Sequence, residues 1–306
     1  MRKKISVIQV PFGLGAGREG TERGPESMLE AGLYRQLRNL GFAIEHESKV
    51  ELPAAQASDT GSGAGGGALE SVKHLAAVKA MSRIVADKVS EAVAARSFPL
   101  VLGGDRSVSI GAFAGLTRHY SRLGVICFDA HAAVNTEETT PLGHVNGMAM
   151  SAALGRSAFT LADIPGSGLP IVKPNVVLIG LRDLEPAERE WIRSERIAFF
   201  SMHEIDRMGI ERVVEQALRI AGEGTDGIHV CLDADVLDPL EAPGVGLQVP
   251  GGLSYREAHF ALELLAESGR ITSMDVTEVN ALLDDNRRTA RLAVGLVTSV
   301  LGKRII

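Results

Sequence analysis

The amino-acid sequence predicts a three-layer α/β fold, in which a mostly parallel central sheet lies between layers of helices. Two observations lead to this prediction: apolar runs alternate with segments of helical periodicity, and three of the apolar runs end abruptly in polar residues. Repeated strand–helix units form parallel sheets that are covered on both faces. The loops after such strands gather ligand-binding side chains at one edge of the sheet. We therefore expect a single domain, residues 1–306, with its site at that edge.

The predicted strands are short runs of aliphatic and aromatic residues. They are 5–10, 42–46, 98–102, the apolar parts of 124–135 and 227–235, 176–180, 197–200 and 271–276. Runs of this length without polar alternation are typical of strands buried on both faces.

Segments of helical periodicity separate these strands. In the first of them, 25–40, apolar side chains recur at helical spacing through Met28, Leu33 and Leu37. The others are 69–95, 107–120, a short helix beginning near Gly147, 186–194 started by Pro186, 202–221 with a break near Gly209, 255–267 and 288–301. Residues 56–68 are rich in glycine and lack the Lys-Ser/Thr of a phosphate-binding loop, so we expect a flexible loop there.

Composition excludes several classes of partner. The chain has 306 residues, 45% of them hydrophobic, and a net charge of −6, so it can bury a large core and carries no basic stripe for nucleic acid or an anionic membrane. No run reaches the ~20 apolar residues of a membrane-spanning helix, and the apolar start suits a first strand better than a signal peptide. The two cysteines, Cys127 and Cys231, lie in predicted neighbouring strands, where they could approach each other. Because two thiols make no disulfide framework, we expect a reducing, cytoplasmic location.

Polar residues at the ends of three strands are the candidate site. Asp129 and His131 are two residues apart, so on a continuing strand they point to one face, where a carboxylate and an imidazole suit a divalent metal. For this pair alone, a helix cap and a turn hydrogen bond are the commoner roles. A second run ends in Asp233 and Asp235, and a third leads into Gly103-Gly104-Asp105-Arg106-Ser107.

Other polar residues give weaker signals. Ser107 and Ser109 lack the Gly-x-Ser-x-Gly elbow of a nucleophile. His203, His229 and His259 stand in helical or strand patterns without neighbouring ligands, which favours ordinary structural roles.

The three strand endings in this order, Gly-Gly-Asp, Asp-x-His and Asp-x-Asp, resemble those of the arginase (ureohydrolase) family, and of bacterial arginases in particular. Segments 17–25 near the N-terminus and 275–280, Asp-Val-Thr-Glu-Val-Asn, are also similar to the family's pattern. The resemblance implies an arginase-like fold and two manganese ions ~3.5 to 4 Å apart that share a hydroxide, which converts arginine to ornithine and urea. It also implies homotrimers, or homohexamers made of two trimers.

Carried over residue by residue, the resemblance leaves one metal position intact and the other incomplete. The ligands Asp129, His131, Asp233 and Asp235 are retained. Arg106 stands where the family has a histidine ligand, and Ala133 where it has an aspartate. Because arginine offers only donors and alanine offers nothing, we expect at most one divalent metal, manganese, or none.

The two substitutions preserve the charge of the site. Omission of one divalent cation removes two positive charges; loss of an aspartate restores one, and a guanidinium in place of a neutral imidazole restores the other. We therefore predict that Arg106 lies near Asp129 and Asp233 and stands in for the missing metal. The alternatives are random drift, or an arginine that extends to solvent.

The substrate side of the resemblance has also changed. Asn135 matches a residue that holds the amino-acid carboxylate, and Asp183 falls on the same side of the site. Glu185 replaces an aspartate that orients the amino group, Leu142 a serine, His144 an asparagine, and Leu247 a threonine beside the guanidinium. Asn146 replaces the histidine thought to transfer protons, with His144 close by. Glu278 remains and would pair with a guanidinium ligand, or alternatively with Arg106.

From the resemblance and its substitutions we expect a pseudo-arginase, with a small guanidino or amino-acid-like ligand and little or no hydrolysis of arginine. The catalytic candidates are Asp129, His144, Asn146 and Glu278. The alternative is an active single-metal C–N hydrolase that acts on a guanidino or amide substrate. In this alternative the site resembles that of the deacetylases of this fold, whose single metal is held by residues similar to Asp129, His131 and Asp233. Those enzymes also need a pair of neighbouring histidines, which this sequence does not offer.

Overall fold

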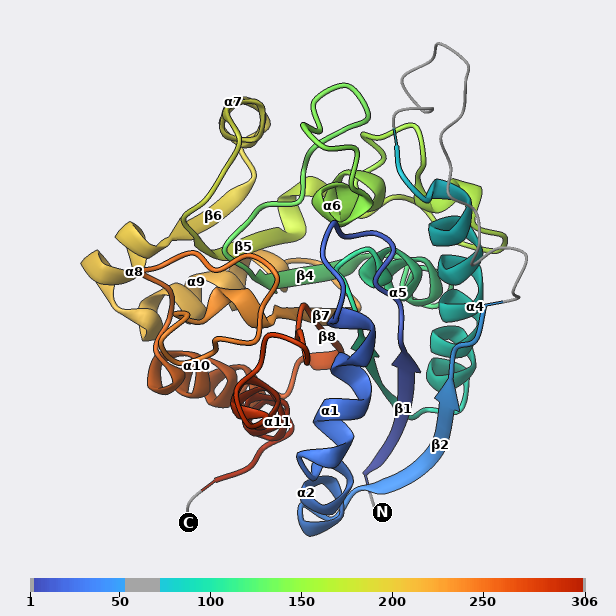
Figure 1. The fold of residues 1–306 in the computed structure, drawn as a ribbon, viewed down its shortest axis with the longest axis vertical. Helices are drawn as coiled ribbons and strands as arrows, with labels where there is room; N and C mark the ends of the chain where they lie inside the picture. The colour runs from blue at the N-terminus through green and yellow to red at the C-terminus, as the bar shows by residue number, and fades with distance from the viewer. Residues whose placement is uncertain (1–2, 53–71, 305–306) are drawn as a thin grey trace.

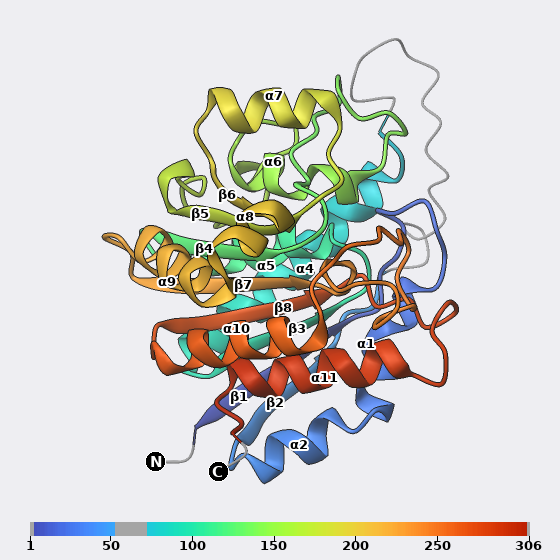
Figure 2. The same cartoon turned by 90° about the vertical axis from the view of Figure 1, so that its left-hand side faces the viewer.

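A parallel eight-stranded sheet forms the centre of the protein. The computed structural model describes residues 3–52 and 72–304. Its strand order is β2-β1-β3-β8-β7-β4-β5-β6, and every pair of neighbours is parallel (Figures 1 and 2). The strands are β1 Lys4–Val10, β2 Ala43–Lys49, β3 Phe98–Gly103, β4 Leu123–Phe128, β5 Val176–Leu181, β6 Ala198–Ser201, β7 Gly227–Asp233 and β8 Ile271–Thr277. The predicted three-layer fold is confirmed.

Helices cover both faces of the sheet (Figure 2). They are α1 Gly24–Glu30, α2 Leu33–Asn39, α4 Leu75–Ala94, α5 Val108–Leu116, α6 Ala149–Ala153, α7 Pro186–Ser194, α8 Met202–Met208, α9 Ile210–Ala221, α10 Tyr255–Glu267 and α11 Arg288–Val300. One apolar core joins the sheet to α1, α2, α9, α10 and α11, and a second joins it to α4, α5 and α6. No helix in the described ranges is both long and apolar enough to cross a membrane.

Most predicted elements are present, and glycines explain the main differences. The helix predicted over 25–40 is divided in two, because Gly32 adopts a left-handed conformation, φ 96°, before α2. Gly209, φ 82°, separates α8 from α9, which confirms the predicted break. The helices predicted at 186–194 and 255–267 have the expected bounds. The predicted loop 56–68 lies outside the described residues.

The strand order brings the polar strand ends together. β3, β8, β7 and β4 are consecutive neighbours at the centre of the sheet, so their carboxyl ends meet at one edge. The turn after β3 packs against the segment after β1, where the Asp105 N–H donates to the Phe12 carbonyl at 2.9 Å. A Cβ on Gly104 would lie 1.9 Å from that carbonyl oxygen, so only glycine allows this approach. The close packing fixes the position from which Arg106 enters the site.

Candidate active site at the carboxyl edge of the sheet

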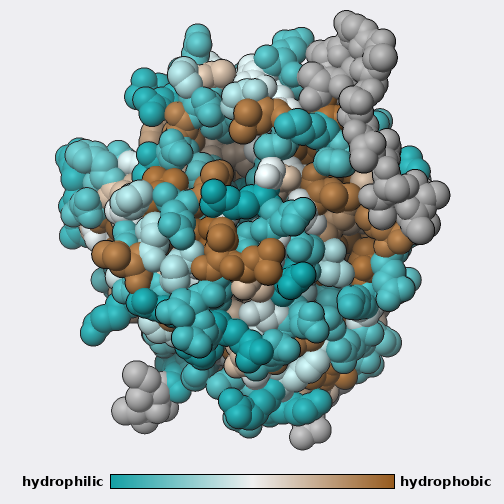
Figure 3. All heavy atoms as spheres, in the orientation of Figure 1, coloured by the Kyte–Doolittle hydropathy of each residue, from teal (hydrophilic) through white to brown (hydrophobic). Residues whose placement is uncertain are grey.

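A pocket of about 350 Å³ opens at this edge of the sheet. Figure 3 shows a hollow on this face, with apolar side chains among the polar ones around it. Its lining includes every residue that the sequence singled out for the site: Arg106, Asp129, His131, Ala133, Asn135, Leu142, His144, Asn146, Asp183, Glu185, Asp233, Asp235, Leu247 and Glu278. Arg18 and Glu188 line it as well, and the sequence had not indicated Glu188.

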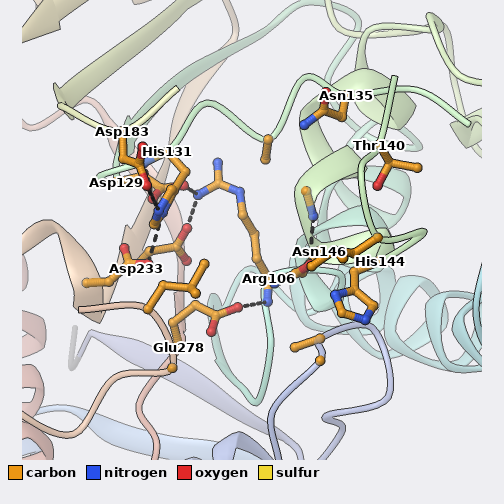
Figure 4. A pocket seen from close by; sticks show the side chains of 18 of the residues that line it. Arg106, Asp129, His131, Asn135, Thr140, His144, Asn146, Asp183, Asp233 and Glu278 are labelled. Atoms are coloured by element: carbon orange, nitrogen blue, oxygen red, sulfur yellow. Dashed lines mark hydrogen bonds and ion pairs between the residues drawn. The ribbon is translucent and has the colours of Figure 1, made fainter. Parts of the chain in front are cut away.

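Arg106 extends across the pocket floor, and its guanidinium lies between two carboxylates (Figure 4). One of its nitrogens, Nη1, forms ion pairs with Asp129 and with Asp233. The side chain is only 4% exposed, so it does not reach solvent. Burial by itself would lower the pKa of Arg106, but Asp129 and the other acidic groups around it together outweigh burial and raise that pKa. The guanidinium is therefore a fixed positive charge beside the predicted metal ligands.

The two carboxylates are held from other directions too. Asp129 Oδ1 accepts a hydrogen bond from the His131 N–H at 2.8 Å, and Asp233 accepts one from the Thr277 hydroxyl on β8. Burial favours the protonated form of Asp129, but Arg106 and then His131 favour its charged form more strongly, so its pKa is lowered. Arg106 therefore pairs with a carboxylate that stays ionised.

Three of the four predicted ligands converge on one point. Ligand atoms of Asp129, His131 and Asp235 all lie within 4.8 Å of one another. Burial would lower the pKa of His131, but Asp235 and Asp129 raise it to about 11, and burial followed by the charge of Asp129 raises the pKa of Asp235. His131 Nδ1 faces the two carboxylates, 3.2 Å from Asp235 and 3.4 Å from Asp129. Among the described residues, His131 Nε2 and Asp235 Oδ1 are buried without a hydrogen-bond partner. A buried carboxylate oxygen and a buried imidazole nitrogen without hydrogen-bond partners are suited to coordinate a divalent cation.

Asp233, the fourth predicted ligand, is engaged elsewhere. Its two oxygens accept from Arg106 and Thr277, so it is not part of the convergent group.

Ala133 offers no side-chain ligand and has a special backbone. It is buried, and its φ of 52° lies in the left-handed region that non-glycine residues seldom adopt. Its carbonyl oxygen accepts hydrogen bonds from Met150 and Ser151 at the start of α6. The position is therefore shaped for a residue that tolerates a left-handed conformation.

On the opposite side of the pocket, several residues assigned to the substrate have local partners (Figure 4). Asn135 Oδ1 accepts from the Thr139 hydroxyl at 3.0 Å, and Asn146 Oδ1 accepts from the next N–H, that of Gly147, at 2.9 Å. Glu185 caps the N-terminus of α7. These contacts engage the amide oxygens of both asparagines, whereas a ligand carboxylate would accept a hydrogen bond from the amide nitrogen of Asn135.

Several exposed residues lie at the mouth of the pocket; among them, Asp183 is on the side of His131, with Oδ2 3.7 Å from its Nε2 (Figure 4). Leu142 and Leu247 are 62% and 57% exposed, and the Asp183 side chain is 63% exposed. His144 Nε2 lies 3.3 Å from Lys73 Nζ; burial, and then the charge of Lys73, lower the pKa of His144. The mouth of the pocket is thus more apolar than an amino-acid head group requires.

Glu278 contacts the backbone of Arg106 and not its guanidinium. Its Oε1 accepts from the Arg106 N–H at 2.9 Å, so the alternative of a guanidinium ion pair is wrong. Burial, and then the charge of Asp105, raise the pKa of Glu278 to about 8. Burial also raises the pKa of Asp105 to about 6, although Asp105 accepts from the N–H groups of Gly15 and Ser107. Like Ala133, Glu278 has a left-handed backbone, φ 63°.

These shifts predict a stability that falls as the pH rises. A carboxyl group whose pKa is higher in the folded than in the unfolded chain stabilises the fold below the unfolded pKa, and that contribution is lost as the pH rises through the folded value. Titration of Glu278 should therefore lower the free energy of unfolding by as much as about 1.4 kcal/mol for each pH unit, until the pH reaches its folded pKa of about 8. His131 adds a decline in the same direction above pH about 6.5.

The measurement is the difference between the unmodified protein and Glu278→Gln in denaturant unfolding, with chelator present, between about pH 6 and pH 8. The variant should lose less stability across this range. Equal slopes for the two proteins would contradict the assignment.

A second polar cluster lies beneath the pocket, and the sequence interpretation of His229 missed it. His229 on β7 contacts Ser273 and Asp275 on β8, at 2.8 and 3.1 Å. The prediction that His229 has no neighbouring ligand is therefore wrong. Pairing of β7 with β8 would have indicated it, because residues 229 and 231 lie opposite 273 and 275. Cys127 and Cys231 are opposite each other on β4 and β7, as the sequence suggested.

Comparison with known proteins gives a consistent result over the whole length. The model of the Arginase family matches residues 3–302. An arginase from Bacillus caldovelox is 43% identical over 99% of this chain and 100% of its own length. The crystal structure of an arginase from Bacillus cereus is 42% identical, covers 100% of both chains and has a TM-score of 0.91. That of an arginase from Bacillus subtilis is 40% identical, covers 99% of this chain and 100% of its own, and has a TM-score of 0.89.

Proposed function

Because the chain belongs to the arginase family of ureohydrolases, we propose that it is a variant arginase in which Arg106 takes the place of one of two metal ions, and that it hydrolyses arginine weakly or not at all. The observation that carries this proposal is the buried guanidinium of Arg106 between Asp129 and Asp233. Carboxylates at this edge need a positive counter-charge, and a planar guanidinium is suited to two of them at once. The substitution of Ala133 fits the same reading, because it removes one negative charge from the position that Arg106 serves.

The other half of the site supports binding of one divalent cation. Asp129, His131 and Asp235 would hold it, with Asp233 available if it gives up one of its present partners. Oxygen and imidazole ligands suit manganese. Such a cation would supply Lewis-acid polarisation of a bound substrate and of water. The chain's own residues then decide which ligand is positioned there.

These residues favour a small cationic ligand and disfavour arginine itself. The carboxyl groups of Asp183, Glu188 and Glu278 line the pocket. The exposed carboxylate of Asp183 would attract a guanidino or amino group, whereas Glu278, with a pKa of about 8, is largely protonated at neutral pH and would act through hydrogen bonds. At the mouth, however, Leu142 and Leu247 place apolar surface where the family resemblance implies hydrogen-bonding side chains, a substrate-contacting serine and a threonine beside the guanidinium. Each buried polar group left without a partner costs roughly 1 to 3 kcal/mol. Arginine should therefore bind poorly.

Manganese stoichiometry tests the proposal directly. After saturation with Mn(II) and desalting, elemental analysis should find one equivalent per chain or less, because Arg106 occupies the space and the charge of a second ion. Asp235→Asn should abolish this equivalent, whereas Glu263→Gln, a change on α10 outside the pocket lining, should leave it unchanged. Two tightly held equivalents would refute the proposal.

A second candidate function is a single-metal C–N hydrolase. The observation that favours it is the intact group of Asp129, His131 and Asp235 with two unpartnered atoms. Against it, His131 and His144 are the two histidines of the pocket lining, and the second is hydrogen bonded to Lys73 instead of lying beside another histidine. Hydrolysis of simple amides or guanidino compounds by the manganese-loaded protein, lost in His131→Asn, would favour this function over the first.

We also propose that the protein assembles as a homotrimer or homohexamer, as its family membership implies, and that it is cytoplasmic, as its two cysteines without a disulfide framework suggest. Multi-angle light scattering at micromolar concentration should give a mass of three or six chains. A stable monomer would contradict this.

A further inference from the structure

A column of polar side chains descends from the pocket floor between the sheet and α5. Successive residues of the same parity on β4, β7 and β8 point to one face of the sheet. Asp129, Asp233 and Thr277 form the upper layer around Arg106. Cys127, Cys231 and Asp275 lie opposite one another in the layer below. This lower layer has no part in the proposed function.

The lower layer, with His229 beneath it, has the composition and geometry of a metal site. Ligand atoms of His229, Cys231 and Asp275 all lie within 4.8 Å of one another, and all three residues are buried. A tetrahedral zinc ion has ligand distances of about 2.0 to 2.3 Å, so such a group can surround one ion with small adjustments. Cys127 is opposite Cys231 in the strand register and, although its thiol is outside this group of three, it is the candidate for a fourth ligand.

Neighbouring side chains hold the imidazole of His229 in a fixed orientation. Ser273 Oγ lies 2.8 Å from His229 Nδ1, and the ring edge of Phe113 on α5 packs against the imidazole. A metal-binding histidine ordinarily has its other ring nitrogen in such a hydrogen bond, which fixes the tautomer. The remaining nitrogen, Nε2, then faces Asp275, 3.1 Å away.

One atom of the cluster lacks any partner. Asp275 is 0% exposed, and its Oδ1 makes no hydrogen bond among the described residues. An unpaired buried carboxylate oxygen costs free energy that a bound cation would recover. The alternative is that no metal binds and that His229, Asp275 and Ser273 form a buried hydrogen-bonded group. It accounts for His229 and Ser273 but leaves this oxygen and the two opposed thiols without a role.

We propose that His229, Cys231 and Asp275, with Cys127, form a buried site for a thiophilic divalent cation of the zinc type, separate from the pocket above it. The two sites differ in ligand chemistry. The pocket offers oxygen and nitrogen and suits manganese, whereas the lower site offers sulfur, which selects zinc or cobalt over manganese. The inference does not rest on the proposed function, and the single equivalent of manganese expected for the pocket is unaffected.

Cobalt(II) is the probe that separates the sites, because bonding of cobalt to a thiolate adds an intense near-ultraviolet absorption band that oxygen and nitrogen ligands do not give. The full-length protein should be produced in cells grown in zinc-depleted, cobalt-supplemented medium, so that the buried site is filled during folding. We expect the thiolate band, with about one equivalent of cobalt attributable to it. Cys231→Ser should abolish the band, and Cys127→Ser should weaken or shift it.

Asp235→Asn is the matched control, because it removes a pocket ligand and leaves the sulfur site intact; the band should persist. If Cys231→Ser does not fold, Cys231→Ala tests the same point, and the unmodified protein alone decides the main question. Absence of the band in folded, cobalt-grown protein overturns the proposal, as does a band that survives loss of Cys231. Neither outcome depends on arginine hydrolysis or on manganese binding.

Discussion

Urea release from arginine, assayed with manganese(II) present, is expected to be very low for the unmodified chain and to return only when Arg106→His and Ala133→Asp are combined. Arg106→His alone restores one ligand but removes the cation that pairs with Asp129 and Asp233. It leaves the position without its second aspartate. Because both changes act within one charge network, their effects should be strongly non-additive.

Ala133→Asp alone should fold but should not recover activity. The left-handed backbone of Ala133 accepts aspartate more readily than alanine, so the change needs no backbone rearrangement. The new carboxylate, however, would lie beside the guanidinium of Arg106 and pair with it. An ion pair of this kind excludes a cation from the same space.

The double variant should exceed each single variant and the unmodified chain by at least about 100-fold in urea release, the scale expected when metal coordination is rebuilt. Turnover should still be below that of a typical arginase, because Leu142, Asn146 and Leu247 remain on the substrate side. Glu263→Gln in the double variant, a change on α10 outside the pocket lining, is the matched control and should leave the recovered activity unchanged. Substantial urea from the unmodified chain, or full recovery with Arg106→His alone, would show that Arg106 does not replace a metal.

Arg106→Leu is expected to destabilise the fold by about 3 to 5 kcal/mol, because it strands the buried carboxylates of Asp129 and Asp233 without a counter-charge. Because leucine keeps much of the aliphatic part of the side chain, the decrease in the free energy of unfolding comes mainly from the lost charge. Lys88→Ala, which breaks an exposed ion pair with Glu91, should cost no more than about 1 kcal/mol. Denaturant unfolding in the presence of chelator measures both.

Manganese then tests whether a metal and the guanidinium are interchangeable. Added Mn(II) should restore part of the stability of Arg106→Leu, since a cation that binds only the folded state stabilises it in proportion to the logarithm of its concentration. The unmodified protein should gain less, because its guanidinium already supplies the charge. If Arg106→Leu loses less than about 1 kcal/mol, the carboxylates do not depend on Arg106.

The sequence by itself determined the sheet and the membership of the pocket. Strands such as 176–180 and helices such as 186–194 are set by local periodicity and by residues such as Pro186, so they were predictable. The edge on which the pocket lies was also predictable, because parallel strands place their carboxyl ends on one edge of the sheet, and the family resemblance supplied the loop residues that line it. The position of Arg106 near Asp129 and Asp233 was predicted from the family resemblance together with the charge balance of the two substitutions.

Only the tertiary structure decided which atoms meet. Asp233 turned out to pair with Arg106 and Thr277 and not to join His131, and Glu278 to contact the backbone of Arg106. His229, which the sequence left without partners, lies beside Asp275 and Cys231 because β7 and β8 are neighbours in a particular register. Strand order, register and side-chain direction are set by packing between segments far apart in the chain, and local sequence patterns carry little information about them.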